Sequence, residues 1–306
     1  MKEITIISGK GGAGKTTVTG SIVSLLDNTV ITDCDVDASD LFLLLQPENL
    51  EHHAFPGGAK AIVNNKLCVN CRKCVNECRF DALYYDDSNI LNINEYYCEG
   101  CGLCKNICPV NAIDMMQEYS NHWFISSTRH GKMVHAKMKP GEENSGKLVS
   151  QLRSAAKEIA IADFAQFIVN DGPPGIGCSA IASVTGTDLV IMVIESTLSG
   201  FHDFKRAKEL VDGFKTPIVA IINKADINIE LTNEIENYLK ENEIPLLGKI
   251  PFDRVMKEAT REGKCVPEYD QSNAITEIFR DIVKQLHGER IYHSSSRDFT
   301  ILKSSS

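Results

Sequence analysis

Eight of the eleven cysteines in this 306-residue chain fall into two runs with the same spacing. The runs are Cys68, Cys71, Cys74 and Cys78, followed by Cys98, Cys101, Cys104 and Cys108. Each run has the form C-x2-C-x2-C-x3-C, which is typical of chains that hold two [4Fe–4S] clusters. Paired C-x2-C motifs also bind tetrahedral Zn²⁺, but two full runs with this spacing favour iron–sulfur clusters.

The spacing also predicts how the ligands divide between the clusters. Three closely spaced cysteines wrap one cube, and the fourth ligand comes from the other run. Site 1 is therefore predicted to use Cys68, Cys71, Cys74 and Cys108, and site 2 to use Cys98, Cys101, Cys104 and Cys78. Pro109 follows the second run, whereas Arg79 stands at the matching place after the first. We expect this difference to alter the local turn without removing a ligand.

The segment that carries the cysteines, residues 61–118, repeats internally. The shift from Cys68 to Cys98 also maps Phe80-Asp81-Ala82-Leu83 onto Val110-Asn111-Ala112-Ile113. Such duplication predicts two similar half-units. Each half is expected to supply a cluster loop, a short helix and a strand.

A second chemical signal lies near the N-terminus, in the run Gly9-Lys10-Gly11-Gly12-Ala13-Gly14-Lys15-Thr16. Glycines let the backbone N–H groups of residues 11–16 surround phosphate oxygens, and a following helix offers its positive N-terminus. In such a loop Lys15 reaches the β- and γ-phosphates and the Thr16 hydroxyl binds Mg²⁺. The loop stands between a β-branched run at residues 3–7 and a helical stretch at residues 15–26, which is the context the motif requires.

The remaining elements predict an α/β fold. Buried strands are expected at residues 30–32, 167–171, 189–194, 218–222 and 246–250, with further strands at 122–125 and 133–136. Helices are expected at residues 145–161, 200–214 and 275–286, the first of them capped by Asn144 or Ser145. Continuous apolar strands separated by helices indicate a mostly parallel sheet covered on both faces. Residues 47–60, which include His52 and His53, are expected to form a connector.

Together these motifs resemble the MinD/ParA/Mrp superfamily of P-loop ATPases, in a form with an inserted two-[4Fe–4S] ferredoxin domain. The resemblance rests on the loop from Lys10 to Thr17, on Asp33-Cys34-Asp35, and on Asp171-Gly172-Pro173-Pro174-Gly175. It implies a P-loop NTPase fold plus a bacterial-ferredoxin-like α+β domain. The implied segments are 1–60 and 119–290 for the ATPase domain, 61–118 for the inserted domain, and 291–306 for a flexible, Ser-rich tail.

The resemblance also implies a role for each matching residue. The implied nucleotide-binding residues are Gly11, Gly12, Ala13, Gly14, Lys15, Thr16, Thr17, Gly175 and Asn223. Asp35 would orient the attacking water, with Asp33 as support, and Lys10 would reach the phosphates across a dimer interface. Asp171 would hold Mg²⁺ with Thr16, and Gly175 would offer its N–H to the γ-phosphate. The family usually has proline after the acid at position 35, whereas Val36 stands here.

The choice of base stays open from the residues alone. Asn223-Lys224-Ala225-Asp226 looks like the guanine-reading N-K-x-D motif, whereas in the MinD-like group an asparagine at this place contacts adenine. The resemblance covers more positions than the four-residue motif does, so we expect ATP rather than GTP.

Composition excludes several classes of function. A net charge of −9 argues against nucleic-acid binding, because phosphate neutralisation needs clustered lysine and arginine. No apolar run approaches the roughly 18 residues of a membrane span, and the N-terminus does not resemble a signal peptide. We therefore expect a cytoplasmic protein without membrane insertion. Cys34, Cys178 and Cys265 are expected to be free thiols.

Three functions compete. The first is an ATPase that couples nucleotide-dependent homodimer rearrangement to electron transfer or to a redox partner. The second is a cluster carrier or assembly ATPase of the Mrp type, which delivers clusters to an acceptor protein. The third is a non-enzymatic partner-binding switch like MinD or ParA. Four thiolates for each cluster count against easy release, so the first is favoured.

Overall fold

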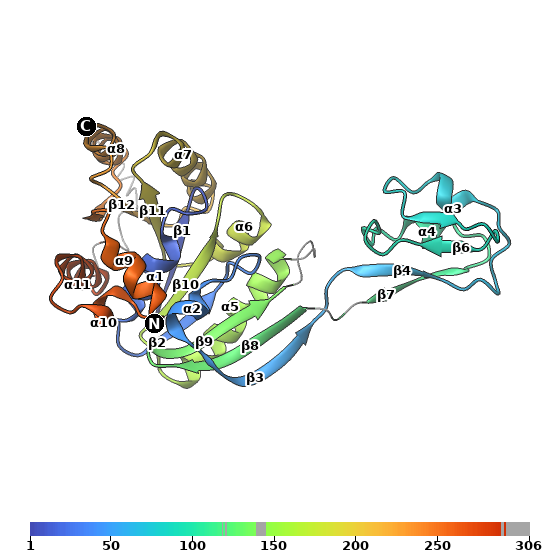
Figure 1. The fold of residues 1–306 in the computed structure, drawn as a ribbon, viewed down its shortest axis with the longest axis horizontal. Coiled ribbons are helices and arrows are strands. Elements are labelled where there is room, and N and C mark those ends of the chain that lie inside the picture. Colours follow the sequence, from blue (N-terminus) through green and yellow to red (C-terminus); the bar gives the residue numbers. More distant parts are fainter. Residues whose placement is uncertain (118, 120, 139–144, 289–290, 292–306) are drawn as a thin grey trace, which may run out of the picture. The chain divides into compact units, whose positions relative to one another are not determined.

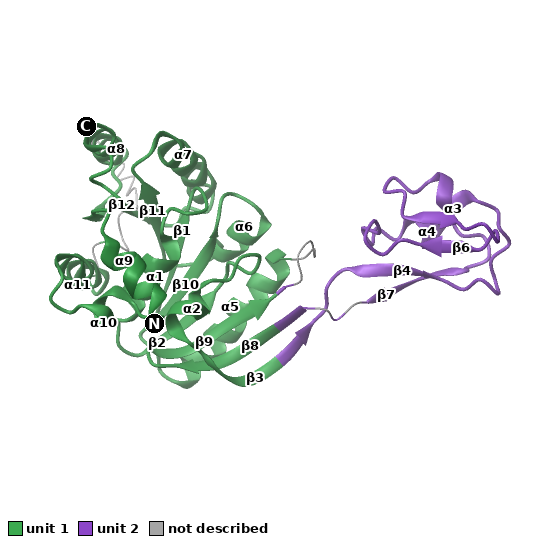
Figure 2. Ribbon diagram, viewed as in Figure 1, with its two compact units in different colours: residues 1–52, 123–137, 145–306 green, residues 53–122, 138–144 purple. Residues whose placement is uncertain are grey.

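The computed structural model describes residues 1–117, 119, 121–138, 145–288 and 291. The chain divides into two compact units, which Figure 2 shows in different colours. Unit 1 comprises residues 1–52, 123–137 and 145–306, and unit 2 comprises residues 53–122 and 138–144. The predicted tail, apart from residue 291, and the predicted cap at Asn144 lie outside the described residues.

Unit 1 is built on a nine-stranded sheet with the order β13-β12-β11-β1-β10-β2-β9-β8-β3 (Figure 1). The strands are β1 (Lys2–Ser8), β2 (Thr29–Asp33), β3 (Glu48–Phe55), β8 (Asn121–Thr128), β9 (Gly131–Lys137), β10 (Phe167–Pro174), β11 (Leu189–Glu195), β12 (Ile218–Asn223) and β13 (Leu246–Ile250). All pairings from β13 through β9 are parallel. The predicted mostly parallel sheet is therefore confirmed.

The predicted connector at residues 47–60 is wrong, because Glu48–Phe55 forms strand β3 at the edge of the sheet. Its residues are mostly exposed, so the sequence lacks the apolar alternation that marks a half-buried strand. Pairing along an existing sheet edge supplies hydrogen bonds that do not depend on side-chain polarity. Strand β4 (Ala59–Val63) also begins within the predicted connector.

Helices cover both faces of this sheet. One face carries α1 (Lys15–Val23), α2 (Leu41–Leu45), α9 (Arg254–Arg261), α10 (Val266–Tyr269) and α11 (Ala274–Leu286). The other carries α5 (Ser145–Ala162), α6 (Cys178–Val184), α7 (Leu198–Asp212) and α8 (Ile229–Glu241). Side chains along a strand alternate between faces, so in β11 Ile191 and Val193 join the first core and Val190 and Met192 join the second.

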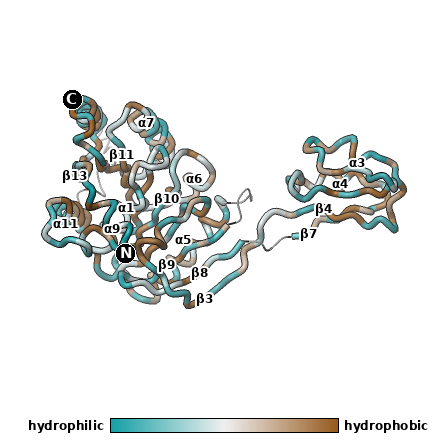
Figure 3. The backbone as a smooth tube through the Cα atoms, viewed as in Figure 1, coloured by the Kyte–Doolittle hydropathy of each residue, from teal (hydrophilic) through white to brown (hydrophobic). Residues whose placement is uncertain are grey.

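The two cores explain why the central strands are continuously apolar. Figure 3 shows hydrophobic residues gathered in the central strands of unit 1, whereas β3 is more hydrophilic. Phe204 of α7 and Phe279 of α11 are both fully buried, one in each core. Burying a side chain of this kind contributes about 1.5–3 kcal/mol. None of the helices in the described part of the chain has the length and apolar character needed to cross a membrane.

Within its described residues, unit 2 contains two short antiparallel strand pairs and two short helices. The pairs are β4 with β7 (Ile113–Gln117), and β5 (Leu83–Tyr85) with β6 (Leu91–Ile93). Helix α3 (Lys73–Asn76) contains Cys74, the third cysteine of the first run, and α4 (Leu103–Ile107) contains Cys104, the third cysteine of the second run. Each half of the segment thus has the predicted loop, helix and strand.

The backbone of unit 2 repeats with the same shift as its cysteines. Val63 pairs with Ile113, and the shifted pair is Ile93 with Leu83. Backbone φ angles in the left-handed region recur at the matching positions Asn70 and Gly100, Arg72 and Gly102, and Asp81 and Asn111. The duplication predicted from the sequence is therefore confirmed in the backbone.

Candidate functional site

Two neighbouring strands, β10 and β2, bring acidic residues to one edge of the unit 1 sheet. In the parallel pairs of β10 with β1 and with β2, Asp171 lies level with Ile6 on one side and with Asp33 on the other. The loop at residues 9–14 follows β1 and leads into α1, so it lies at the same edge. Ligands of open α/β sheets bind outside the carboxyl ends of the strands.

Lys15 is buried at the start of α1 and faces two carboxylates. Only 6% of its side chain is exposed, and its Nζ lies 3.0 Å from Asp171 Oδ1 and 3.5 Å from Asp35 Oδ2. Burial acts to lower the pKa of Lys15, but the carboxylates around it outweigh burial and raise the pKa. The ammonium group therefore remains charged at neutral pH.

Asp171 accepts hydrogen bonds from two threonine hydroxyl groups at this edge. Thr16 Oγ1 donates to Asp171 Oδ2 at 2.9 Å, and Thr19 Oγ1 donates to Oδ1 at 2.7 Å. The fold thus brings together Thr16 and Asp171, the two oxygen ligands predicted for Mg²⁺. Nothing in the sequence signals Thr19, because a hydroxyl inside a helix ordinarily bonds to the preceding turn.

Asn223, at the end of strand β12, contacts the glycine loop. Gly14 has a φ of 88°, in the region that favours glycine, and a Cβ at this position would lie 2.2 Å from Asn223 Nδ2. Asn223 Nδ2 donates to Ala13 O at 2.8 Å. Asn223 therefore holds the loop in this structure, and its predicted contact with a base stays a prediction.

Asp33 is fully buried at the end of β2 and fixes the loop that follows. Its Oδ1 accepts from the Asp35 N–H at 3.1 Å, and its Oδ2 accepts from Ser39 Oγ at 2.6 Å. Burial raises the pKa of Asp33 to about 7, and the charge of Asp171 adds to the rise. Burial also raises the pKa of Asp35, although Lys15 opposes that change.

Lys10 is engaged within its own chain. Its Nζ lies 2.5 Å from Glu195 Oε2. Glu195 Oε1 lies 2.6 Å from Lys224 Nζ, which also donates to Gly12 O at 3.2 Å. Glu195 thus bridges two lysines beside the loop. The sequence signal for Glu195 is an acid at the end of a buried strand, the pattern that also identifies Asp171.

The other predicted residues lie at the same edge. Gly11, Gly12 and Ala13 form the loop, and Thr17 lies in the first turn of α1. Gly175 has a φ of 83°, and its N–H donates to Ser8 O at 3.0 Å. The predicted contact of Gly175 with a γ-phosphate requires this hydrogen bond to open, and that role stays a prediction.

This edge of the sheet has the chemistry of a site for a metal-bound polyanion. The loop and the N-terminus of α1 supply backbone donors, and Lys15 supplies a cation. Thr16 and Asp171 supply oxygen atoms, which are the ligands that Mg²⁺ prefers. Asp35 lies beside Lys15 and offers a further carboxylate.

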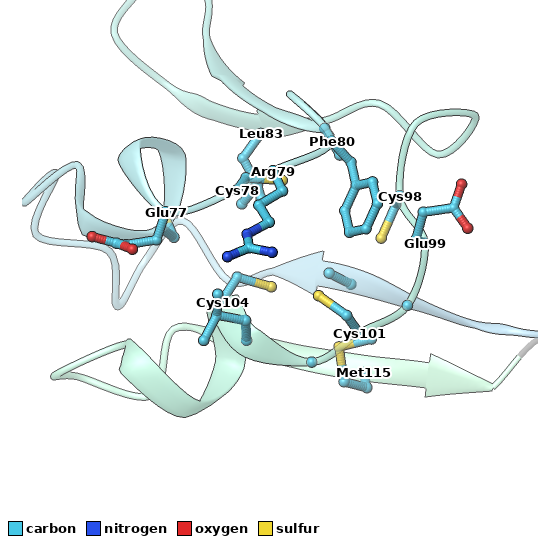
Figure 4. A pocket seen from close by; sticks show the side chains of 16 residues that line it. Glu77, Cys78, Arg79, Phe80, Leu83, Cys98, Glu99, Cys101, Cys104 and Met115 are labelled. Carbon is cyan, nitrogen blue, oxygen red and sulfur yellow. The ribbon is translucent and has the colours of Figure 1, made fainter.

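In unit 2, the four site 2 cysteines Cys78, Cys98, Cys101 and Cys104 line a cavity of about 270 Å³. Figure 4 shows the sulfur atoms of Cys98, Cys101 and Cys104 turned toward its interior. Phe80, Leu83 and Met115 form apolar parts of the wall, and Arg79 and Cys74 also border the cavity. The fourth cysteine comes from the other run, as the spacing predicts.

The four site 1 cysteines Cys68, Cys71, Cys74 and Cys108 line a second, much smaller cavity of about 10 Å³. Tyr85, Leu91 and Ile113 are among the residues that form its walls. The fold therefore brings each predicted set of four cysteines to one cavity, and Cys74 borders both.

The donor chemistry of these cavities fits a soft metal centre. All eight cysteines are free thiols. Burial raises the pKa of Cys74 and of Cys104, whereas at Cys108 burial is outweighed by backbone N–H groups, which lower the pKa. One of these donors is the Ala112 N–H, 3.2 Å from Cys108 Sγ. Grouped thiols that are partly buried become thiolates when a metal supplies the compensating charge.

The three cysteines outside the runs are also free thiols. Cys34 and Cys265 are buried, whereas Cys178 is exposed at the start of α6. Burial raises the pKa of Cys265, so this thiol stays protonated at neutral pH.

Comparison with known proteins places this chain in a family. The family model "CobQ/CobB/MinD/ParA nucleotide binding domain" matches residues 4–266. An uncharacterized protein of Methanocaldococcus jannaschii is 31% identical over 231 residues, which cover 74% of this chain and 80% of the relative. A shorter match, to pyruvate synthase subunit PorD of the same organism, is 39% identical over 59 residues and covers 19% of this chain and 69% of that subunit.

Solved structures share the fold of the chain. The septum site-determining protein MinD from Pyrococcus horikoshii, complexed with Mg-ADP, superimposes with a TM-score of 0.57 at 18% identity. The match covers 93% of this chain and 95% of that protein. The predicted α/β P-loop NTPase fold is thereby confirmed, while the ferredoxin-like nature of the inserted segment stays a prediction. This chain belongs to the CobQ/CobB/MinD/ParA nucleotide binding domain family.

Proposed function

We propose that this chain is a MgATP-dependent switch that carries two [4Fe–4S] clusters and couples ATP binding and hydrolysis to electron transfer. The observation that carries the proposal is the division of eight cysteines into two sets of four, each around its own cavity, within a nucleotide-binding chain. When bound, such clusters supply one-electron transfer.

The cluster ligands would be Cys68, Cys71, Cys74 and Cys108 at site 1, and Cys98, Cys101, Cys104 and Cys78 at site 2. Each set uses four thiolates, one for each iron. Cys74 borders both cavities, so the two sites adjoin within unit 2. The apolar walls limit the access of water, which helps to retain the clusters.

The nucleotide site would act mainly by positioning and charge stabilisation, as phosphoryl transfer requires. Lys15 would bind the β- and γ-phosphates, and Thr16 and Asp171 would hold Mg²⁺. Asp35 would orient the attacking water. Its carboxylate lies 3.5 Å from Lys15 Nζ, at the edge where the loop would hold the phosphates.

A contact of Asp226 supports ATP rather than GTP. Asp226 Oδ1 accepts a hydrogen bond from the Phe252 N–H at 2.5 Å. A guanine-reading aspartate presents its carboxylate to two donors on the base, whereas here one oxygen is already engaged by the backbone. The name of the structural relative, MinD with Mg-ADP, is consistent with adenine.

Lys10 would act in a nucleotide-dependent homodimer. Its side chain is 28% exposed and is held by Glu195, a group that a neighbouring phosphate can replace. We infer that Lys10 exchanges the Glu195 carboxylate for the phosphates bound by a second copy of the chain. This exchange would link the state of the nucleotide to the association of two chains.

The proposal is tested on full-length protein purified without oxygen. Iron and acid-labile sulfide are measured first, and about eight of each per chain are expected for two cubes. Electron paramagnetic resonance (EPR) spectra of the dithionite-reduced protein are then recorded with and without MgATP. We expect MgATP to change the spectrum in the wild type and not in Lys15→Ala, which should retain its iron. Lys264→Ala, at an exposed lysine, is the matched control and should respond like the wild type.

Other outcomes point elsewhere. Zinc in place of iron would refute the cluster assignment. Transfer of iron and sulfide to an added apo-ferredoxin, accelerated by MgATP, would favour the cluster carrier over electron transfer. An equal spectral response in the wild type and in Lys15→Ala would refute coupling through the predicted nucleotide site.

A further inference from the structure

The two cysteine cavities are lined by matching positions of the internal repeat. Besides the cysteines, Ala82 and Leu83 at site 2 correspond to Ala112 and Ile113 at site 1. The strand register and the left-handed backbone positions repeat as well. Differences between the two sites therefore come from a few side chains that line matching parts of the two cavities.

The first difference is a hydroxyl group at site 1. Tyr85 lines site 1, and Met115 lines site 2 at the matching position. The Tyr85 hydroxyl oxygen is buried and makes no hydrogen bond of ordinary geometry within the described residues, and the Cys68 side chain lies within its reach. A buried hydroxyl of this kind requires an acceptor, and it is a donor that methionine lacks.

The second difference is positive charge at site 1. Arg72 lines site 1 where site 2 has Gly102. The guanidinium carbon of Arg72 lies 5.1 Å from the centroid of the Tyr85 ring, and Arg72 Nη2 donates to Asn89 Oδ1 at 3.4 Å. These contacts hold the charge beside the cavity. Lys73 adds a second cation to the lining of site 1, where site 2 has Leu103.

The third difference is negative charge at site 2. Glu99 lines site 2 where site 1 has Val69, and Glu77 also lines site 2. Arg79, which extends over the same cavity (Figure 4), opposes these two carboxylates in part. These groups are exposed, so salt screens their effect. The charged side chains nevertheless make site 1 more positive than site 2, and this charge difference favours a reduced cluster at site 1, as the Tyr85 hydroxyl does.

Reduction adds one negative charge to a cluster, so a hydrogen bond to its sulfur or a nearby cation favours the reduced form and raises the potential. We propose that site 1, bound by Cys68, Cys71, Cys74 and Cys108, holds the cluster of higher potential, with the Tyr85 hydroxyl as the main cause. A chain that carries one electron would then keep it at site 1. This inference rests on the proposed function, because it requires both clusters to be present.

The test is a potentiometric titration of the anaerobic full-length protein followed by EPR. Two separate midpoint potentials are expected. Cys71→Ser and Cys101→Ser, at matching positions, assign them: the higher-potential signal should persist in Cys101→Ser and be lost or altered in Cys71→Ser. Tyr85→Phe should shift the electron's equilibrium away from site 1 by about tenfold, the scale of one hydrogen bond, which equals about 59 mV for a one-electron couple.

Tyr84→Phe is the matched control. Tyr84 precedes Tyr85 in β5, its side chain points to the opposite face, and it is 48% exposed. We expect both potentials to be unchanged in this variant, and the lower potential to be unchanged in Tyr85→Phe.

Three results would overturn the inference: equal potentials for the two clusters, a higher-potential signal that is lost in Cys101→Ser, or the same potentials in Tyr85→Phe as in the wild type. Iron and sulfide analysis separates these outcomes from failure of the proposed function. Protein without iron and sulfide would refute both, whereas two clusters with the wrong order of potentials would refute this inference alone.

Discussion

Replacing Glu268 with glutamine should loosen the hairpin of β8 and β9 from the core of unit 1. Glu268 lies in α10 and accepts from both Arg129 Nε at 2.5 Å and Arg129 Nη2 at 2.9 Å. Its Oε1 lies 2.8 Å from His130 Nε2, and its Oε2 accepts from the Cys265 N–H at 2.7 Å. Arg129 and His130 form the turn between β8 and β9, so one carboxylate joins this turn to the helices that cover the sheet.

The size of the effect follows from the pKa of Glu268. Burial acts to raise it, but the hydrogen bonds from Arg129 and Cys265 outweigh burial and lower the pKa from 4.5 to about 2. The Glu268 side chain is 22% exposed, so solvent screens the interaction only in part. Each pKa unit corresponds to about 1.4 kcal/mol, so the ionised carboxylate stabilises the folded state by about 3 kcal/mol at pH 7.

The assay is urea unfolding followed by the fluorescence of Trp123. Trp123 is the one tryptophan of the chain, it lies in β8, and it is 9% exposed. At pH 7 we expect Glu268→Gln to lower the free energy of unfolding of this region by about 3 kcal/mol. A lowered folded-state pKa gives stability that is present above pH 4.5 and lost as the pH falls toward 2. The difference between wild type and variant should therefore narrow below about pH 5.

Glu262→Gln is the matched control, because Glu262 pairs with Lys264 on the surface and both side chains are about half exposed. An exposed ion pair of this kind contributes at most about 1 kcal/mol. A loss in Glu268→Gln no larger than that in Glu262→Gln would refute the reasoning. A difference of about 3 kcal/mol that stays constant from pH 7 to pH 3 would show that packing, and not charge, is responsible.

Two further predictions concern the nucleotide site. Gly14→Ala should abolish binding of a fluorescent ATP analogue, because the φ of Gly14 is 88° and a Cβ at this position would lie 2.2 Å from Asn223 Nδ2. The control is Gly213→Ala, at a position with a helical φ of −58°, which should bind the analogue normally. Normal binding by both variants would contradict the role of the loop. Asp33→Asn should change how the stability of the magnesium-free, nucleotide-free protein depends on pH. Because the folded-state pKa of Asp33 is raised from 3.8 to about 7, the folded state binds the proton more tightly, and this residue's contribution falls as pH rises from 4 to 7 and stays low above 7. Urea unfolding at pH 5 and pH 8 should thus show a smaller loss of stability with rising pH in Asp33→Asn than in the wild type, and equal losses would contradict the assignment.

Residues close together in the sequence allow local chemistry to be predicted. The cysteine spacing divides the ligands into two sets, and the fold brings each set to one cavity. The glycine loop predicts that Lys15 binds phosphate, and the apolar runs predict the strands of the parallel sheet. These features depend on short stretches of backbone and on periodic apolar residues, which a sequence displays directly.

Strand β3 could not be predicted from the sequence, because its exposed residues show no apolar pattern and the strand with which it pairs is distant in the chain. Side-chain contacts between residues that are far apart in the sequence could not be predicted either, because they also depend on which strands are neighbours. The bridge from Lys10 through Glu195 to Lys224 exists because β1, β11 and β12 are neighbours in the sheet. Asn223 braces the glycine loop for the same reason.

The sequence by itself determined the donor atoms of this protein: eight thiols in two registers and a phosphate-binding loop, each set by spacing along the chain. Only the tertiary structure decided which charges and hydroxyls surround them. The order of strands in the sheet selects Glu195 as the partner of Lys10, and the cross-pairing of the two halves of unit 2 brings Tyr85 to one cysteine cavity and Met115 to the other. The spacing along the chain shows which residues are close in the sequence, whereas the pairing of strands decides which distant residues come into contact.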